Sequence, residues 1–486
     1  MIRDFSPAGV YYLEVSCGEN PRASLDYLCH YRSPHMMGLD ADYSVSQAFH
    51  AGGWPTFVVI DAEGIVRFHG FDSDRELYGI RRCLNDLLKA KPLDSKTAVM
   101  SHGIAYLPDV HAARQAHRDR SPRLCFDAAG NPLVVFYSNQ SGTNSVYLRR
   151  YNTQGQKLGE ERLSAADVES YAADCVTDTA GALWVTWCAH PGRYYDIFVQ
   201  CRREGKEPVT EQLTHSDDDA MSPKIAAGAD GSLMVAYYEW AMLWGYSRDR
   251  NIFARRYDPV RHAWEAAQEV SPHVPEVEDH TDPDVVIDPH GNNWVVWSYD
   301  YHPQLYKKPV DAAQPTIFAA RVASNTVSPA MLVGATGQFR DAIDLFPSAA
   351  LDGQGTLWCA WDCSEPHRCI RLARLNAPDN TFKAIAAFGD QGETCSTPEL
   401  SPAGGERLVL AWSRRRVGEA WRGRVALLQE GRTIAETAPS EESDVLFPQA
   451  QLGPDGRCWV VYEKAAPKGS EIILRDLHRE LETAAK

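Results

Sequence analysis

The sequence predicts a mainly β protein, in which a seven-bladed β-propeller of four-stranded blades follows a smaller α/β segment. Three observations predict the propeller: a turn glycine recurs, proline precedes it, and aromatic residues follow it at fixed offsets. The glycines are Gly130, Gly181, Gly231, Gly291, Gly355, Gly405 and Gly456. Their successive gaps are 51, 50, 60, 64, 50 and 51 residues. Four short antiparallel strands fill such a period in a propeller blade.

The first strand and the turn of each repeat have a common pattern. Proline lies eight residues before the glycine in five copies: Pro122, Pro223, Pro283, Pro347 and Pro448. The sixth copy has Pro398 seven residues before its glycine, and the second copy has Ala173 at the proline position. Four turns read Asp-x-x-Gly, two have Asp directly before Gly, and the sixth copy lacks the Asp. Asp and Gly favour a tight hairpin, because Asp caps the backbone locally and Gly accepts positive φ.

The second strand carries aromatic residues three and six positions after the glycine, such as Trp184 with Trp187 and Trp294 with Trp297. Offsets of three and six fall on opposite faces of a strand. Both faces are therefore apolar, which indicates a sheet packed between two neighbouring sheets. A third strand follows in most copies and a fourth is less distinct. An array of sandwich modules is the alternative, but sandwich strands keep no such period.

Composition excludes several classes of protein. The chain has 486 residues, a hydrophobic content of 44% and a net charge of −16 without a long basic run, so nucleic acid is not an expected partner. No apolar run reaches about 18 residues, so no membrane span is expected. The 12 cysteines include no Cys-x-x-Cys, and their spacing matches no zinc module. We predict no metal and no cofactor.

The densest cysteine group is Cys359, Cys363 and Cys369, with His367 among them. A metal site is one interpretation of this group. The alternatives are a strand position for Cys359 with a Cys363–Cys369 disulfide across a loop, or three thiols.

Residues 1–95 follow a different pattern. Residues 10–15 read as a strand, residues 21–31 as a helix, and residues 75–91 as an amphipathic helix. Two strands around Asp61-x-x-Gly64 form a hairpin. This order resembles the C-terminal two thirds of a thioredoxin-like domain, of the redoxin or periplasmic disulfide-reductase type. Trp54-Pro55-Thr56 matches the cis-proline motif of that family, which makes Pro55 the cis-proline candidate. A generic ββα unit is the alternative.

The departure from that family matters for function. Its Cys-x-x-Cys segment and first strand are absent, and residues 1–5 look like the end of its first helix. We therefore expect the sequence to be truncated at its N-terminus and to begin inside a longer reading frame, whose upstream part supplies that strand. A Cys-x-x-Cys pair and a secretory signal stay open as further upstream elements. A periplasmic or secreted location follows only in that case. The rival is a redox-inactive remnant packed on the propeller, and we interpret Cys17 as structural.

We predict three segments: an incomplete thioredoxin-like domain at residues 1–95, a linker at 96–102 and the propeller at 103–486. Residues 103–108 are expected to complete the last blade as its outer strand, which would remove two sheet edges.

Two sets of loops share one face of the predicted propeller: those before the proline strand and those after the second strand. Propellers usually bind ligands on this face over the channel, an argument from fold analogy. We predict that ligand-binding residues lie in these loops: Arg193, Asp219, Glu239, Trp240, Trp244, Arg248, Asp279, Asp300, His302, Asp341, Asp362, His367, Arg368 and Arg414. The alternative is a solvated, charged face on an inert scaffold.

Aromatic platforms beside carboxylates and guanidinium groups suit a saccharide or another polar small molecule. We therefore expect a recognition protein that binds such a ligand or a protein partner. One alternative is a thiol–disulfide oxidoreductase with an upstream Cys-x-x-Cys, and another is a glycoside hydrolase or lyase that uses carboxylates. The blades also resemble sialidase-like propellers in combining Asp, Gly and Trp at a turn. The spacing differs from that family, however, and no arginine triad can be assigned.

Overall fold

The computed structural model describes residues 119–484 with short gaps, together with four strands among the first 118 residues. The gaps are residues 193, 244–246, 272–278, 301–315, 324–325, 335–343, 364–367, 377, 417–419, 441–444 and 467–468. The chain divides into two units, Met1–Gln115 and Ala116–Lys486. The predicted boundaries at residues 95 and 103 lie outside the described residues.

The first unit contains two strand pairs. β1 (Leu13–Cys17) pairs in parallel with β2 (Met36–Asp40), and β3 (Thr56–Ile60) pairs antiparallel with β4 (Val66–Phe71). The strand expected at residues 10–15 therefore begins three residues later, whereas the hairpin lies where it was expected. Pro55, the two expected helices and the expected closing strand at residues 103–108 lie outside the described residues. The thioredoxin-like resemblance stays a prediction.

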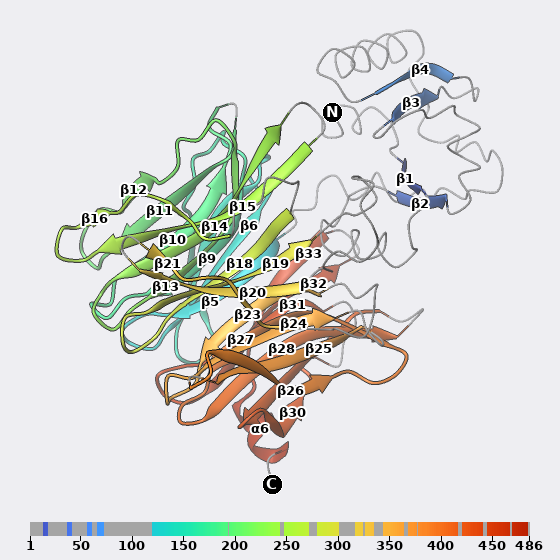
Figure 1. Ribbon diagram of the computed structural model, residues 1–486. Coiled ribbons are helices and arrows are strands. Elements are labelled where there is room, and N and C mark those ends of the chain that lie inside the picture. The colour runs from blue at the N-terminus through green and yellow to red at the C-terminus, as the bar shows by residue number, and fades with distance from the viewer. Residues whose placement is uncertain are drawn as a thin grey trace. The chain divides into compact units, whose positions relative to one another are not determined.

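The second unit is a seven-bladed β-propeller (Figure 1), as the repeat predicts. Each blade is an antiparallel meander whose first strand is innermost, and blades 1, 2, 5 and 6 have four strands. Blade 1 contains β5 (Asp119–Phe126), β6 (Pro132–Ser138), β7 (Ser145–Tyr151) and β8 (Lys157–Arg162). Blade 2 contains β9 (Ser170–Thr177), β10 (Leu183–Ala189), β11 (Asp196–Arg202) and β12 (Val209–Gln212). Blade 5 contains β23 (Asp344–Leu351), β24 (Leu357–Cys363), β25 (Cys369–Asn376) and β26 (Thr381–Phe388). Blade 6 contains β27 (Glu393–Pro402), β28 (Arg407–Arg416), β29 (Arg422–Gln429) and β30 (Arg432–Thr437).

The remaining blades vary this plan. In blades 3 and 4 the fourth strand is split into two short pieces that pair with the same third strand. Blade 3 contains β13 (Asp219–Ala227), β14 (Leu233–Leu243), β15 (Ser247–Asp258), β16 (Ala263–Trp264) and β17 (Gln268–Glu269). Blade 4 contains β18 (Asp279–Ile287), β19 (Asn293–Asp300), β20 (Thr316–Ala323), β21 (Thr326–Val327) and β22 (Met331–Leu332). Blade 7 shows three strands among the described residues: β31 (Val445–Leu452), β32 (Cys458–Ala466) and β33 (Gly469–Asp476).

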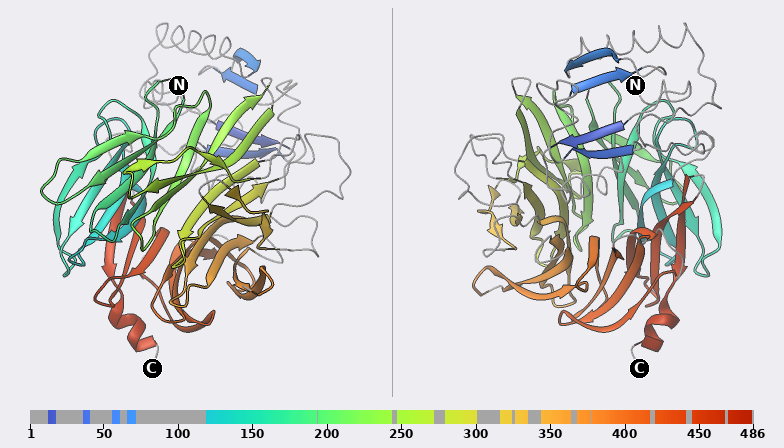
Figure 2. Two further views of the ribbon diagram at one scale, coloured as in Figure 1. Left: turned by 60° about the vertical axis from the view of Figure 1, so that its left-hand side comes forward. Right: turned by 90° about the vertical axis from the view of Figure 1, so that its right-hand side faces the viewer.

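The ring closes between the last blade and the first. β31 and β32 contact β5, and the two blades lie side by side in Figure 2. The Ser470 hydroxyl of β33 donates a hydrogen bond to the Asp119 carbonyl of β5 at 2.7 Å. One apolar core, which includes Phe136 and Trp459, fills the space between these blades. The helix α6 (His478–Ala484) follows β33, and its Leu481 packs into the core between blades 6 and 7. Among the described residues, no helix is long and apolar enough to cross a membrane.

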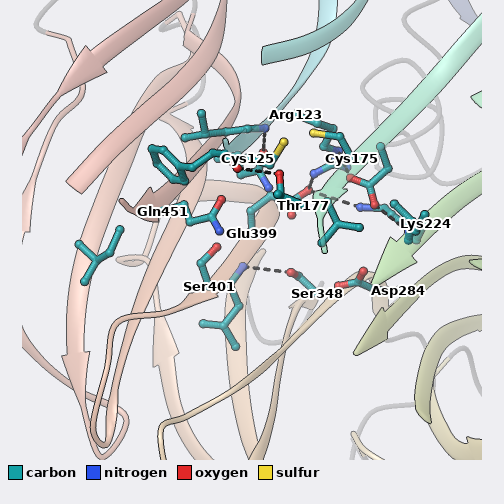
Figure 3. A pocket seen from close by; sticks show the side chains of 18 of the residues that line it. Arg123, Cys125, Cys175, Thr177, Lys224, Asp284, Ser348, Glu399, Ser401 and Gln451 are labelled. Carbon is teal, nitrogen blue, oxygen red and sulfur yellow. Dashed lines mark hydrogen bonds and ion pairs between the residues drawn. The ribbon is translucent and has the colours of Figure 1, made fainter. Parts of the chain in front are cut away.

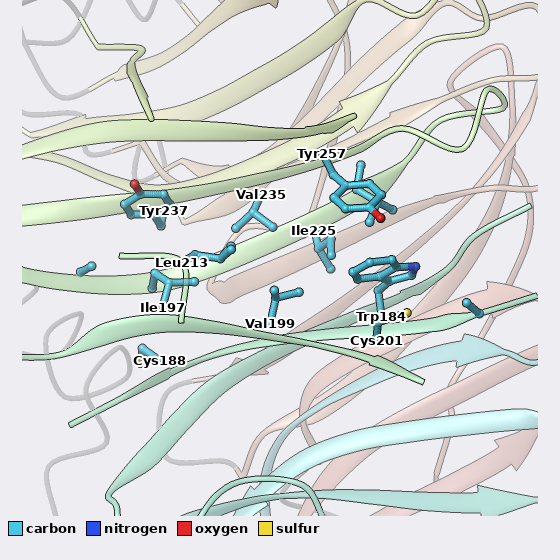
Figure 4. Close-up of a cluster of buried hydrophobic side chains, with 13 residues drawn as sticks. Trp184, Cys188, Ile197, Val199, Cys201, Leu213, Ile225, Val235, Tyr237 and Tyr257 are labelled. Atoms are coloured by element: carbon cyan, nitrogen blue, oxygen red, sulfur yellow. The ribbon is translucent and has the colours of Figure 1, made fainter. Parts of the chain in front are cut away.

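Each interface between neighbouring blades holds its own apolar core. Trp184 of β10 packs toward blade 3 and Trp187 of the same strand packs toward blade 1, so their side chains occupy opposite faces as predicted. Figure 4 shows the core between blades 2 and 3, where Trp184 lies beside Tyr257 and near Ile225. The same division holds for Trp294 and Trp297 of β19. Burial of both faces of every sheet provides the apolar area that holds the ring together.

The recurring Asp and Trp of the repeat contact each other at the hairpin between the first and second strands. The Trp184 indole donates to Asp178 at 2.8 Å, and Trp358 donates to Asp352 at the same distance. The Asp178 carboxylate also accepts the backbone amides of Ala180 and Ala182. One aspartate therefore closes the turn and fixes a core tryptophan, which explains their constant spacing.

Candidate functional site

Each innermost strand carries a β-bulge at the same place in the repeat. The residue before the proline position has φ between 48° and 53°, and the ladder register shifts there in all seven blades. These residues are Ser121, Ala172, Ser222, Asp282, Phe346, Thr397 and Phe447. Blade 2 forms the bulge with Ala173 instead of proline, so proline is not required for it. Proline has no backbone N–H to donate. It is tolerated at a bulge because the residue there makes no ladder hydrogen bond.

The residue after the proline position is polar in all seven blades. We call these seven residues the channel ring: Arg123, Asp174, Lys224, Asp284, Ser348, Glu399 and Gln449. All seven line one cavity of about 390 Å³ in the central channel (Figure 3). Sequence reasoning missed this ring. Its signal was a polar residue after every repeated proline, in a strand whose neighbouring residues are mostly apolar.

Part of the channel ring ties neighbouring blades together. Four of its side chains each accept a hydrogen bond from a backbone amide of the following blade, at 2.6 to 3.0 Å. The donor and acceptor pairs are Leu124 to Gln449, Ile225 to Asp174, Ala349 to Asp284, and Leu400 to Ser348. These bonds satisfy inner-strand amides that no further strand covers.

The charged members in blades 1, 3 and 6 meet across the channel instead. Arg123 of β5 donates a hydrogen bond to Glu399 of β27, and Lys224 of β13 lies 3.9 Å from the same carboxylate oxygen. Burial alone would raise the pKa of Glu399, but Arg123 and Lys224 together hold it below its usual value. Blades 1, 3 and 6 are not neighbours, so this cluster, the channel bridge, spans the axis of the propeller.

The cavity extends from the channel ring toward the Asp-Gly turns. Its further lining includes Phe126, Thr177, Ser401, Gln451 and Pro454, which follow the ring along the inner strands. The side chains of the ring's charged residues Arg123, Asp174, Lys224 and Glu399 are 13 to 20% exposed, so the cavity admits water to them. The cavity is of a size that small-molecule sites in proteins have, roughly 300–1,000 Å³.

The opposite end of the blades is the loop rim, where each innermost strand begins and each second strand ends. Strand register brings several residues predicted from sequence to this rim. Asp219 stands opposite Trp240 between β13 and β14, and Asp279 stands opposite Asp300 between β18 and β19. The predicted sharing of one face by the two sets of loops is therefore confirmed for these strands. Arg248 of β15 pairs with Met242 near the same end.

A row of partly exposed aromatic side chains occupies the loop rim of blades 1 and 2. We call it the aromatic row: Tyr137, Tyr171, Tyr195 and His190. Successive ring centroids lie 6.2, 5.2 and 4.7 Å apart, along the order Tyr137, Tyr171, Tyr195, His190. Burial raises the pKa of both Tyr171 and Tyr195, so both phenols are neutral at physiological pH. None of these four residues is among the ligand-binding residues predicted from the sequence.

The aromatic row continues into blade 3 through Asp219. The Tyr195 amide donates to the Asp219 carboxylate at 2.8 Å. Beside Asp219, the Arg250 guanidinium lies 4.9 Å from the Trp240 ring centre. Glu239, the residue before Trp240, points to the other face of β14, where the Ser216 hydroxyl donates to it at 3.4 Å. Burial, with Asp218 nearby, raises the pKa of Glu239 to about 7.

Three other predicted residues are bound within the protein. Asp362 accepts from Arg368 at 2.8 Å, and the two side chains are only 2% and 4% exposed. Ser396 of β27 donates to the same carboxylate, so this pair joins blades 5 and 6. Arg414 of β28 donates to Glu393 at 2.9 Å. The remaining predicted residues lie outside the described residues: Arg193, Trp244, His302, Asp341 and His367.

The sequence allows a metal site, a Cys363–Cys369 disulfide or three thiols for the group of Cys359, Cys363 and Cys369. Cys359 lies in β24 as one alternative expected, and Cys363 stands directly opposite Cys369 between β24 and β25, both as thiols. His367 is not among the described residues. Within the described part of the chain, no three His, Cys, Asp or Glu side chains are grouped to hold a metal ion.

Comparison with known proteins shows the fold alone. No protein-family model and no curated protein matches the chain. A solved polysaccharide lyase of a new family, an ulvan lyase, has a TM-score of 0.52 and 11% identity over 76% of this chain and 98% of its own. Its structure bound to -[GlcA(1-4)Rha3S]- gives a TM-score of 0.51 and 11% identity, with the same coverage. A protein of unknown function from Dyadobacter fermentans has a TM-score of 0.46 and 13% identity over 75% of this chain and 96% of its own.

Proposed function

We propose that this chain is a recognition protein whose loop rim at blades 1 to 3 binds a saccharide or a similar polar cyclic ligand. The observation that carries the proposal is the aromatic row, four partly exposed rings in contact with one another, joined to Asp219. Tyr137 packs partly against the core between blades 1 and 2, and Tyr171 against the core between blades 2 and 3, whereas Tyr195 and His190 belong to neither core.

The chemistry of the row suits a ring with polar edges and apolar faces. Phenol and imidazole rings offer flat surfaces for stacking, and their polar atoms can exchange hydrogen bonds with hydroxyl groups. Asp219 has one oxygen bound by the Tyr195 amide, which fixes the carboxylate as an acceptor for ligand hydroxyls. The ulvan lyase structures support the proposal only to the extent that this fold is able to present a saccharide site. A protein partner is the other ligand class that such a rim suits.

A glycan array with the full chain tests this proposal. We expect at least one saccharide class to be retained by the wild-type protein and lost by Tyr195→Ala. The matched control is Leu158→Ala, an equally simple truncation of a 64% exposed side chain on the outer strand β8. If no glycan is retained, or if both variants bind like the wild type, the proposal is wrong.

An enzyme is the second candidate, favoured by Glu239. A carboxyl group with a pKa of about 7 is protonated in part at neutral pH, as a general acid in glycoside cleavage must be. Product analysis of any retained glycan separates binding from cleavage by a hydrolase or lyase. Cleavage that is lost in Glu239→Gln favours the enzyme, and an unchanged glycan favours recognition alone.

The oxidoreductase alternative concerns residues outside the described part of the chain and stays a prediction. Reading the genomic DNA upstream of the Met1 codon tests it. An in-frame Cys-x-x-Cys supports thiol–disulfide chemistry, and an in-frame stop codon contradicts it.

A further inference from the structure

The cavity in the central channel is a second place where a ligand fits, separate from the loop rim. It is polar at the channel ring, and its further lining combines Ser401 and Gln451 with the apolar side chains of Phe126 and Leu452. A cavity of about 390 Å³ is large enough for a molecule of monosaccharide size. Which molecule it suits depends on the charges of the ring.

The charges of the channel ring do not balance. Two cations, Arg123 and Lys224, face three carboxylates, Asp174, Asp284 and Glu399. Both cations pair with Glu399, and Arg123 also lies 3.9 Å from Asp174. One carboxylate is therefore in excess when all five groups are ionised.

Asp284 is the carboxylate without a cation partner. Its Oδ1 accepts the Val285 amide at 2.9 Å and its Oδ2 accepts the Ala349 amide at 2.8 Å. Among the described residues, no Lys, Arg or His lies within ion-pair distance of Asp284. Lys224 favours the ionised form of Asp284 only from a greater distance. Two backbone amides orient the carboxylate but bring no net charge.

We propose that the channel cavity binds a small amine, whose ammonium group pairs with Asp284 and whose hydroxyl groups bond to Ser348, Ser401 and the Gln side chains of the lining. An ammonium balances the excess carboxylate, whereas an anionic ligand would add to it. Asp284 is ionised at neutral pH, because burial raises its pKa only to about 6. The channel bridge stays intact, since the ligand competes for neither Arg123 nor Glu399.

Three monosaccharides of one size and different charge test this inference: glucosamine, glucose and glucuronate. Titration calorimetry with the full chain at pH 7.5 should give binding of glucosamine at least tenfold tighter than of glucose, and none of glucuronate. Asp284→Asn should weaken glucosamine binding at least tenfold while keeping an oxygen for the Ala349 amide.

Two variants make the result specific. Asp282→Asn removes the same charge two residues earlier on β18, outside the cavity lining, and should bind glucosamine like the wild type. Tyr195→Ala on the loop rim should also leave this binding unchanged, which separates the inference from the proposed function. Thermal unfolding by circular dichroism confirms that each variant folds. Absence of glucosamine binding, equal binding of the three sugars, or equal affinity in Asp284→Asn and the wild type would overturn the inference.

Discussion

Glu399 in blade 6 accepts a hydrogen bond from Arg123 in blade 1, although blade 7 separates the two along the ring. Lys224 of blade 3 approaches the same carboxylate from another side of the channel. The bridge therefore connects blades that share no sheet and no apolar core.

The first prediction concerns this bridge. Glu399→Gln removes the carboxylate that Arg123 and Lys224 share and leaves Arg123 only Asp174, at 3.9 Å. The unfolding free energy should therefore fall by roughly 2–4 kcal/mol, less than for a fully buried pair because water enters the cavity. Urea unfolding followed by tryptophan fluorescence measures this. Glu406→Gln, at an exposed turn position, is the control and should change stability by less than about 0.5 kcal/mol. Equal stability of the two variants would show that the bridge contributes nothing.

The second prediction concerns the turn aspartates. Asp178→Ala removes both the turn acceptor and the acceptor for the Trp184 indole. Asp127→Ala removes the turn acceptor and the acceptor for the Asn131 side-chain amide but affects no indole, because Leu133 takes the Trp position in blade 1. We expect Asp178→Ala to cost about 1–2 kcal/mol more than Asp127→Ala, since it leaves a buried indole N–H without a partner. Urea denaturation compares the two variants, and equal costs contradict the role given to Trp184.

The third prediction concerns the bulges. Thr397 has φ of 53°, a conformation that costs a β-branched residue of order 1–3 kcal/mol and glycine nothing. Thr397→Gly should leave stability unchanged or raise it by up to about 1 kcal/mol. Thr394→Gly, on the same strand in an ordinary ladder position, should lower it by about 1 kcal/mol. A larger loss at position 397 than at 394 would show that the Thr397 side chain stabilises the bulge.

The fourth prediction concerns pH. Burial raises the pKa of Asp284 from 3.8 to about 6, so the folded state holds this proton over a range where the unfolded chain has released it. The contribution of this group to stability is therefore complete below pH 3.8 and is lost as pH rises to about 6. The charged groups that face it are Lys224 and Arg123, which favour ionisation, and Glu399 and Asp174, which oppose it.

Asp284→Asn tests the sign of this effect. The difference in unfolding free energy between the wild type and the variant should change between pH 4 and pH 7, with the wild type losing stability relative to the variant as pH rises. Asp282→Asn should run parallel to the wild type. A difference that grows in the opposite direction would mean that the folded state prefers the ionised carboxylate.

The repeat predicted most of the fold because its signals are local. The glycine and the nearby Asp indicate a tight turn. The aromatic residues three and six positions later indicate that both faces of a single strand are buried. Trp184 and Trp187 were correctly placed on opposite faces for this reason. The bulge was not predicted, because the residues with positive φ are of several types, and Ala172 forms it without a following proline.

The site residues were harder to predict, because strand register and contacts between blades bring them together. Asp219 and Trp240 lie together because strand register fixes them as partners. Asp362 and Arg368 are near each other in sequence and do meet, but as a buried pair between blades 5 and 6. Arg123 and Glu399 are 276 residues apart, and no pattern in either segment points to the other.

The most direct test is hydrogen–deuterium exchange of the protein with and without a glycan that the array retains. It asks whether the ligand binds at the loop rim of blades 1 to 3. We expect slower exchange on binding in peptides that contain Tyr195, Asp219 and Trp240, with unchanged exchange in the Asp-Gly turns. Protection confined to peptides around the turn glycines Gly130, Gly181 and Gly231 would contradict it, because those turns lie at the opposite end of the same blades.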